Sequence, residues 1–171
     1  ILSYTLPSGQ QDNAQFAISG GNKLASNAVF DYETKKIYNI IVRGTDPGGL
    51  YIERPFTITV KNVSEPPTKL TLSDTTVREN LPEGTKIGYF SHNDPDSADV
   101  VTYSLFVGPG STDNSSFRII DDTLFTNMVF DYEVKKTFSI RVRATDKGGK
   151  YYDQVFIITI INDPSDDPII A

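Results

Sequence analysis

The amino-acid sequence predicts an all-β protein made of two tandem antiparallel β-sandwiches. Three observations lead to this prediction. The sequence repeats itself at a spacing of 100 residues, apolar and polar residues alternate along short segments, and no segment longer than a turn has a helical period. With 171 residues, of which 38% are hydrophobic and 22% charged, the composition is typical of globular domains.

The internal repeat is the clearest feature of the sequence. Residues 29–62 and 129–162 are identical at 19 of 34 positions. The run Val29–Glu33 recurs as Val129–Glu133, and the glycine pair Gly48–Gly49 recurs as Gly148–Gly149. This degree of identity indicates that one structural unit occurs twice.

The best-defined elements are two strands joined by the glycine pair. Residues 138–143 alternate between apolar and polar side chains, and Phe156, Ile158 and Ile160 repeat the same spacing of two. A period of two is typical of a strand with one buried face, and glycines tolerate the positive φ of a tight turn. We therefore expect a hairpin here and another 100 positions earlier.

Shorter strands are predicted upstream in the second repeat. They cover residues 70–77, 86–90, 101–106, 117–120 and 123–126. With the hairpin, they amount to seven strands within about 95 residues, separated by turn residues. This pattern is typical of an immunoglobulin-like Greek-key sandwich.

The two repeats differ in completeness. Tyr4–Leu6 matches Tyr103–Leu105, the third predicted strand of the second repeat, so residues 1–62 form a partial repeat without its first two strands. We expect a linker at 63–68, a complete repeat at 69–163, and a linker or the start of a next repeat at 164–171. The chain is either a window on a longer array or a unit that a neighbouring chain completes by adding strands.

Composition excludes several classes of function. The net charge is −6 and the pI is near 4.7, which argues against nucleic-acid binding. The absence of cysteine excludes disulfides and thiolate metal sites, and the single histidine, His92, argues against histidine-based zinc sites. The most apolar run, residues 155–161, is too short to span a bilayer, so no direct membrane insertion is expected.

Acidic motifs recur in a fixed order along the second repeat. Glu79 lies in the first strand region, Asp94-Pro95-Asp96 follows the second strand, Asp131-Tyr132-Glu133 precedes the hairpin, and Asp146 begins its turn. In this order and spacing, the motifs resemble those of cadherin repeats, most closely the bacterial-type cadherin-like repeats. The resemblance covers the second repeat and the last five strands of the first, and implies sandwiches of the cadherin type.

These acids have the chemistry of a calcium site. Ca²⁺ takes six to eight oxygen ligands, mostly from carboxylates and carbonyls. Asp-x-Asp and Asp-x-Glu on extended loops place two carboxylates on one side, at the ends of a sandwich where successive domains meet. Without a cation, two such charges 4–5 Å apart repel by about 3–4 kcal/mol at an effective dielectric near 20. We expect the junction between the repeats to be flexible without Ca²⁺ and rigid with Ca²⁺ bound.

The resemblance implies specific ligands. For a site between the repeats they are Asp31, Glu33, Asn62, Glu65, Asp94, Asp96 and Asp146. For half of a site shared with a following repeat they are Glu79, Asp131, Glu133 and Asp163. The linker Asn62–Pro67 departs from the family pattern Asp-x-Asn-(Asp/Glu)-x-Pro, so we expect only one or two ions between the repeats.

The predicted function is that of a Ca²⁺-binding extracellular module, a calcium-rigidified spacer or adhesion segment of a larger, membrane-associated surface protein. Its partner would be another protein or a second copy. One alternative is a carbohydrate-binding sandwich that presents Tyr51, Tyr151 and Tyr152 to cell-surface sugars, and another is a fibre subunit that assembles by strand complementation. The sequence contains no Ser-His-Asp order and no phosphate-binding loop, so we do not expect an enzyme.

Overall fold

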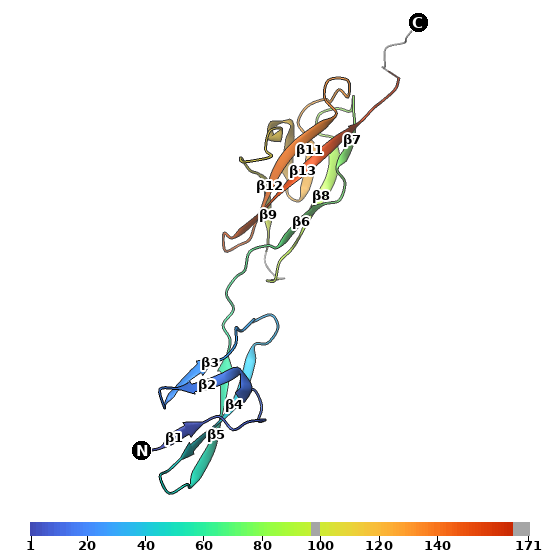
Figure 1. Cartoon of the computed structure of the whole chain (residues 1–171). Coiled ribbons are helices and arrows are strands. Elements are labelled where there is room, and N and C mark those ends of the chain that lie inside the picture. The colour runs from blue at the N-terminus through green and yellow to red at the C-terminus, as the bar shows by residue number, and fades with distance from the viewer. Residues whose placement is uncertain (97–99, 166–171) are drawn as a thin grey trace. The chain divides into compact units, whose positions relative to one another are not determined.

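The computed structural model describes residues 1–96 and 100–165 and divides the chain into two compact units, Ile1–Val63 and Ser64–Ala171 (Figure 1). Each unit consists of strands and one short 3₁₀ turn, which confirms the predicted all-β class. No helix in the described part of the chain has the length and apolar character needed to cross a membrane.

The second unit is a two-sheet sandwich. One sheet has the strand order β10-β11-β8-β6 and the other the order β7-β13-β12-β9. Its elements are β6 (Lys69–Leu72), β7 (Thr76–Arg78), β8 (Lys86–Asn93), β9 (Thr102–Leu105), η2 (Asn114–Ser116), β10 (Phe117–Ile120), β11 (Thr123–Thr126), β12 (Thr137–Thr145) and β13 (Tyr151–Ile161).

The predicted hairpin is the longest antiparallel pair of this unit. β12 and β13 pair continuously from Thr137 opposite Thr159 to Thr145 opposite Tyr151. The turn between them contains Gly149, whose φ of +84° lies in a region that L side chains rarely adopt. The requirement for glycine at this turn therefore follows from its backbone conformation.

The first predicted strand, residues 70–77, is in fact two strands that belong to different sheets. β6 pairs with β8, whereas β7 pairs with β13, and this second pair is parallel. Between them, Asp74 accepts hydrogen bonds from the Thr76 amide (2.9 Å) and the Thr76 hydroxyl (2.8 Å). Such a local turn competes with the strand ladder, and it lets the chain cross from one sheet to the other.

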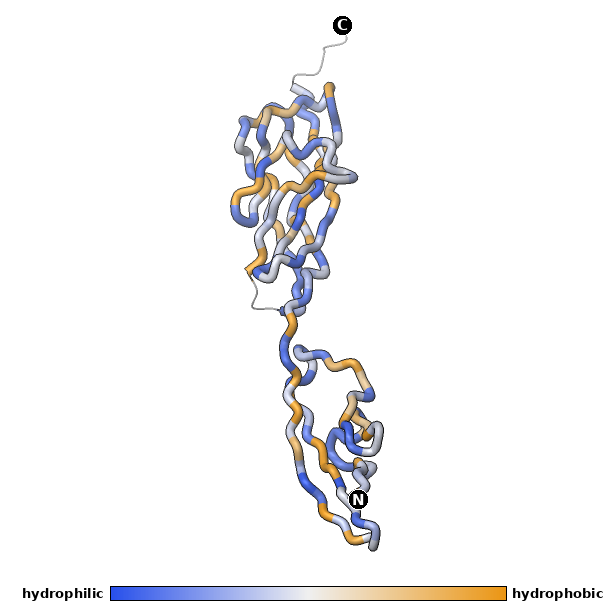
Figure 2. Tube along the Cα trace, turned by 90° about the vertical axis from the view of Figure 1, so that its left-hand side faces the viewer, coloured by the Kyte–Doolittle hydropathy of each residue, from blue (hydrophilic) through white to orange (hydrophobic). Residues whose placement is uncertain are grey.

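The core of the second unit lies between its two sheets. Leu124, Ile140, Val142 and Ile158 have no exposed surface. At one end of the core, Phe130 packs against Phe117 and Phe138, with ring centroids 5.3 and 4.6 Å apart. Figure 2 shows hydrophobic and hydrophilic positions alternating along the strands that enclose this core.

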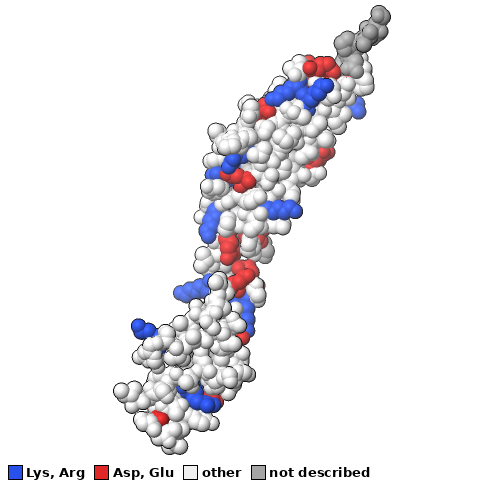
Figure 3. All heavy atoms as spheres, viewed as in Figure 1, with Lys and Arg blue, Asp and Glu red and all other residues white. Residues whose placement is uncertain are grey.

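The outer face of the β12–β13 sheet carries a charged cluster. Arg143 donates to both carboxylate oxygens of Asp153 (2.7 and 2.9 Å), and Arg141 donates to the same side chain (2.8 Å). The hydrogen bond from Arg143, together with that from Arg141, lowers the pKa of Asp153 to about 2. In the view of Figure 3, basic and acidic side chains are interspersed over this unit, which is how such pairs neutralise a surface.

The first unit repeats only the later strands of the second. Its sheets are β1-β4-β5 and β2-β3, and Phe16, Tyr38 and Ile40 form its buried core. The elements are β1 (Ser3–Thr5), η1 (Asn13–Gln15), β2 (Phe16–Ser19), β3 (Lys23–Ser26), β4 (Ile37–Thr45) and β5 (Tyr51–Thr59). They correspond in order and pairing to η2 and β9–β13, and residues 1–63, all of them described, contain no counterpart of β6, β7 or β8.

Candidate metal centre

Acidic residues gather at the end of the second unit where the linker enters. Asp94 follows β8 directly, and Asp146 follows β12 directly. The linker reaches the same end because Lys69, the first residue of β6, pairs with Asn93, the last residue of β8. The topology of the sandwich thus brings three separate stretches of sequence together.

Asp146 is 5% exposed and holds the linker. Its Oδ1 accepts from the Lys150 amide (2.7 Å), which fixes the hairpin turn, and its Oδ2 accepts from the Ser64 hydroxyl (3.1 Å). The Lys150 ammonium group also donates to the Ser64 carbonyl oxygen. The linker is therefore fastened to the β12–β13 turn through both the side chain and the backbone of Ser64.

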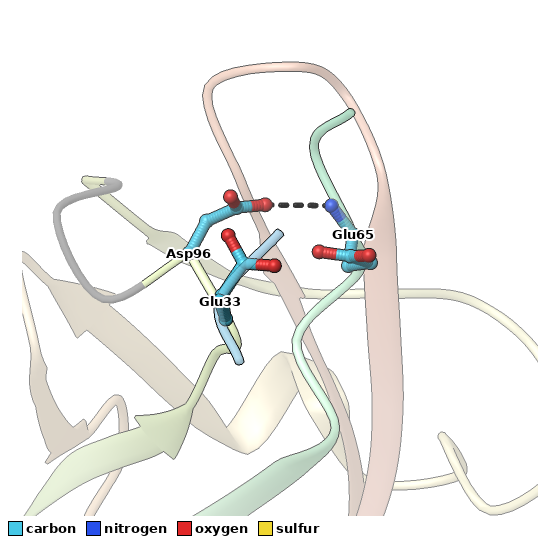
Figure 4. A group of neighbouring side chains, drawn as sticks. All are labelled: Glu33, Glu65 and Asp96. Carbon is cyan, nitrogen blue, oxygen red and sulfur yellow. Dashed lines mark hydrogen bonds between the residues drawn. The ribbon is translucent and has the colours of Figure 1, made fainter. Parts of the chain in front are cut away.

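Glu65 and Asp96 form a second attachment. The Glu65 amide donates to Asp96 Oδ2 at 2.6 Å (Figure 4), and the Asp96 amide donates to Asp94 Oδ1 at 2.9 Å. Two further carboxylate oxygens, Asp94 Oδ2 and Glu65 Oε2, are buried without a hydrogen-bond donor among the described residues. A buried carboxylate oxygen without a donor is costly unless a cation neutralises it, so this all-oxygen set fits Ca²⁺.

A second acidic group lies within the same unit, beyond the end of β7. Glu79 is 1% exposed, and its carboxylate accepts from the Tyr132 amide (2.6 Å) and the Asp163 amide (2.7 Å). These two bonds tie the end of β7 to the loop before β12 and to the segment after β13. They hold the Glu79 side chain in one position.

Asp131 and Glu133 complete this group. Each of the three residues has a carboxylate oxygen within 4.8 Å of the others, with Glu79 buried and the other two exposed. Two unit charges at that distance repel by about 3–4 kcal/mol at an effective dielectric near 20. The group consists of oxygen donors at different depths, which is the ligand type that Ca²⁺ prefers.

Asp163 joins this end through its backbone rather than through its carboxylate. Its amide donates to Glu79, whereas its Oδ1 accepts from the Ser165 amide at 3.2 Å. Hydrogen bonding to Ser165, with a smaller contribution from the positive charge of Arg78, lowers the pKa of Asp163. The side chain is thus ionised and holds the turn that follows β13.

In the first unit, Asp31 and Glu33 lie on the loop before β4. Asp31 accepts from the Glu33 amide (2.8 Å), the Thr34 amide (3.1 Å) and the Thr34 hydroxyl (2.8 Å). The Thr34 hydrogen bonds are the main reason why the pKa of Asp31 lies below its usual value. Asn62 is exposed at the end of this unit. Because these three residues belong to the first unit, their meeting with Glu65, Asp94, Asp96 and Asp146 stays a prediction.

Two residues that act on the linker were absent from the predicted ligand set. Ser64 bonds to Asp146, and Lys150 bonds to the Ser64 carbonyl group. The only signal for Lys150 in the sequence is a difference between the repeats, because Leu50 occupies the equivalent position. As for the proposed sugar-binding tyrosines, Tyr51 and Tyr151 each cover an arginine, Arg43 at 4.2 Å and Arg143 at 3.5 Å.

Comparison with known proteins gives consistent results. The family profile described as "Cadherin domain" matches residues 73–161. Human Protocadherin-16 is 27% identical over 177 residues, which cover 99% of this chain and 5% of that protein. Rat Protocadherin Fat 2 is 33% identical over 146 residues, which cover 81% of this chain and 3% of that protein. The chain therefore spans only a small part of the length of these relatives.

A solved protocadherin structure has a similar fold. The crystal structure of human Protocadherin-24 EC1-2 superposes with a TM-score of 0.71 at 20% identity, covering 95% of this chain and 83% of that one. At this identity the match supports the fold alone, and it agrees with the predicted tandem sandwiches.

Proposed function

The chain belongs to the cadherin family, and on that premise we propose that its two repeats bind Ca²⁺ at the ends of their sandwiches and act as a calcium-rigidified spacer of a larger surface protein. Membership of this family confirms that the chain is a non-enzymatic module of the adhesion type. It also confirms the resemblance to cadherin repeats that the sequence motifs indicated.

The observation that carries the proposal is the group formed by Glu79, Asp131 and Glu133. Their carboxylate oxygens converge to within 4.8 Å, although the residues are up to 54 positions apart in the sequence. Glu79 is held there by two backbone amides, so the acidic group is built into the fold rather than formed by chance side-chain positions. One of these two amides belongs to Asp163.

At the other end of the second unit, Asp94, Asp96 and Asp146 supply carboxylates, and Glu65 supplies one from the linker. The buried oxygens without donors on Asp94 and Glu65 are the features that favour a cation here. We propose that Asp31, Glu33 and Asn62 of the first repeat contribute to the same site, as the family resemblance implies. Hydrogen bonding to Thr34 lowers the pKa of Asp31 below its ordinary value.

The mechanism is mechanical. Bound Ca²⁺ supplies positive charge that joins carboxylates which otherwise repel one another. The chain itself positions the linker: Asp146 and Lys150 hold Ser64, and Asp96 holds the Glu65 amide. Neutralising the acidic groups then stiffens the connection between the repeats.

The setting follows from the same premise. Cadherin ectodomain repeats are extracellular in the relatives that match, and extracellular calcium is abundant enough for sites with dissociation constants of about 10⁻⁴–10⁻³ M. We propose an extracellular location and, as partner, another cadherin-type protein or a second copy of this one.

A calcium titration of the full chain tests the proposal. Saturating Ca²⁺ is expected to raise the melting temperature by roughly 10 °C, since ligand at a hundredfold excess over its dissociation constant adds about 2.7 kcal/mol per site. Small-angle scattering is expected to show a longer and less flexible particle. The double variant Asp94→Asn with Asp96→Asn should lose the scattering change and part of the thermal shift.

A charge-matched control separates binding from general electrostatics. Asp121→Asn with Glu83→Gln removes two exposed negative charges that belong to neither predicted ligand set, and it should respond to Ca²⁺ like the parent chain. A parent chain with the same melting curve and scattering profile in chelator and in saturating Ca²⁺ would falsify the proposal.

A further inference from the structure

The turn between β12 and β13 lies in close contact with the linker residue Ser64. A Cβ atom added at Gly148 would lie 2.9 Å from the Ser64 hydroxyl oxygen and 3.5 Å from the Ser64 Cβ, so the glycine leaves the space that the serine occupies. Both residues belong to the second unit. The close approach brings the polar groups of Ser64 within reach of the side chains of the turn.

Three hydrogen bonds form a closed ring between the turn and Ser64. The Lys150 amide donates to Asp146 Oδ1 (2.7 Å), and the Ser64 hydroxyl donates to Asp146 Oδ2 (3.1 Å). The Lys150 ammonium group donates to the Ser64 carbonyl oxygen. Both oxygens of the buried Asp146 carboxylate, and the carbonyl oxygen beside it in the ring, therefore have donors from the protein itself.

The other acids at this end of the unit differ in this respect. Asp94 Oδ2 and Glu65 Oε2 are buried without a donor among the described residues. Buried oxygens of this kind are costly unless a cation reaches them. The end of the unit thus has two halves. The Ser64–Asp146 half is satisfied by donors of the chain, whereas the Glu65–Asp94 half needs a cation from solution.

The positive charge at the Ser64 carbonyl oxygen comes from a lysine. Backbone carbonyl and carboxylate oxygens are ligands that Ca²⁺ takes, and here an ammonium group, a compact point charge with three donors, occupies the carbonyl oxygen. The turn itself does not require the lysine. In the first repeat Leu50 stands at the equivalent position, and its amide donates to Asp46 Oδ1 (2.9 Å) in the same way.

We propose that the Lys150 ammonium group is a built-in cation that takes the place of a metal ion in the Ser64–Asp146 half. It keeps the linker on the second unit without Ca²⁺, and it leaves the Glu65–Asp94 half as the part of this end that binds Ca²⁺. The first consequence does not depend on calcium binding, whereas the second rests on the proposed function.

Hydrogen exchange of the Glu65 amide tests the first consequence. This amide follows Ser64 directly and donates to Asp96, so it is protected while the linker lies on the second unit. In the full chain in chelator, Lys150→Met is expected to speed its exchange about tenfold, the effect of losing one hydrogen bond from a charged group. NMR-detected exchange measures the rate.

Two further variants separate the charge from the side chain. Lys150→Arg keeps a positively charged donor and should retain most of the protection, which side-chain bulk without charge would not restore. Lys147→Met removes an exposed lysine from the same turn and should leave the exchange rate of the Glu65 amide within twofold of that of the parent chain.

The number of bound Ca²⁺ ions tests the second consequence. Lys150→Met leaves the Ser64 carbonyl oxygen and Asp146 without the positive charge, so this variant is expected to bind one more Ca²⁺ per chain than the parent at saturation. Adding Asp146→Asn to Lys150→Met should remove the extra ion. Equilibrium dialysis against Ca²⁺ counts the ions.

Two results would overturn the proposal. One is a Glu65 amide that exchanges at the same rate in Lys150→Met and in the parent chain in chelator. The other is an equal number of bound Ca²⁺ ions in these two chains. A parent chain that binds no Ca²⁺ would instead contradict the proposed function, and the exchange rates in chelator would still decide the role of Lys150.

Discussion

The two repeats share five strands, β1–β5 in the first and β9–β13 in the second, but their cores differ. Ile158 and Val142 have no exposed surface in the second repeat, whereas their counterparts Ile58 and Val42 are only partly buried in the first. The difference does not come from the core-facing residues of these strands, because Ile40, Val42 and Ile58 recur as Ile140, Val142 and Ile158. It comes from β6 and β8, which cover the core of the second repeat and have no counterpart in the first. Burial of a side chain is thus a property of its neighbours.

A feature that does not depend on those neighbours is conserved between the repeats. Asn13 donates to the carbonyl groups of Pro7 (2.8 Å) and Ile41 (3.0 Å), and accepts from the Ile41 amide (2.8 Å). Asn114 donates to Phe106 (3.1 Å) and accepts from the Arg141 amide (3.0 Å). In both units, one asparagine ties a 3₁₀ turn to the sheet.

The strongest test of this comparison is a pair of matched core truncations. Leu124→Ala should destabilise the second unit by about 2–5 kcal/mol, because it opens a cavity in a closed core. Leu24→Ala should cost the first unit less than about 1 kcal/mol, because Leu24 already contacts water. Denaturant unfolding followed by NMR signals assigned to each unit measures both values. Equal costs would contradict the difference in cover.

A smaller effect is expected at the charged cluster of the second unit. Because the folded pKa of Asp153, about 2, lies below its ordinary value of 3.8, its stabilisation is complete above pH 4 and disappears as the pH falls through 2. Asp153→Asn should cost about 1.5–3 kcal/mol at pH 7 and flatten this part of the pH profile.

The matched variant in the first unit is Glu53→Gln, which removes a pair with Arg43 alone. This pair is more exposed, with side-chain exposures of 35% for Arg43 and 30% for Glu53, so the expected cost is below about 1 kcal/mol. Measuring the unfolding free energy of each unit between pH 2 and 7 compares the two variants. A pH profile of the second unit that Asp153→Asn leaves unchanged would disprove the assignment.

The smallest difference in stability loss between the units should appear at the two asparagines. Here the first unit, and not the second, should lose more. Asn13→Ala and Asn114→Ala should each cost about 1–2 kcal/mol, because an amide of the sheet loses its acceptor. Within the described residues, the Asn13 side chain makes three hydrogen bonds and the Asn114 side chain two, so the first unit should lose more. Hydrogen exchange at Ile41 and Arg141 reports each loss directly, and a larger cost at Asn114 would contradict the bond count.

Most of the fold can be predicted from the sequence, because most strands carry their own local pattern of alternating side chains and turn residues. Alternation along residues 138–143 and the glycine turn at Gly148–Gly149 predict the β12–β13 hairpin. The split of residues 70–77 into β6 and β7 was not predicted, since it depends on an Asp74 turn and on which sheet each half joins. The parallel pairing of β7 with β13 was not predicted either, because it joins segments about 80 residues apart.

The residue types of the candidate site could be predicted from the sequence, but several of its contacts could not. The motifs identified Glu79, Asp131 and Glu133 as one group before any geometry was known, and their oxygens do converge. They gave no indication that the Asp163 amide holds Glu79, or that Ser64 and Lys150 fasten the linker. Such contacts depend on loop geometry, which carries no periodic signal in the sequence.

The parallel pairing of β7 with β13 has a consequence for tension. When the second repeat is pulled through its linker and through the segment after β13, the two strands are drawn in opposite directions along their length. The ladder from Thr76 opposite Thr159 to Arg78 opposite Ile161 is then loaded in shear, so its hydrogen bonds share the force instead of opening one at a time. A strand of only three residues thereby carries part of the load between the two ends of the repeat.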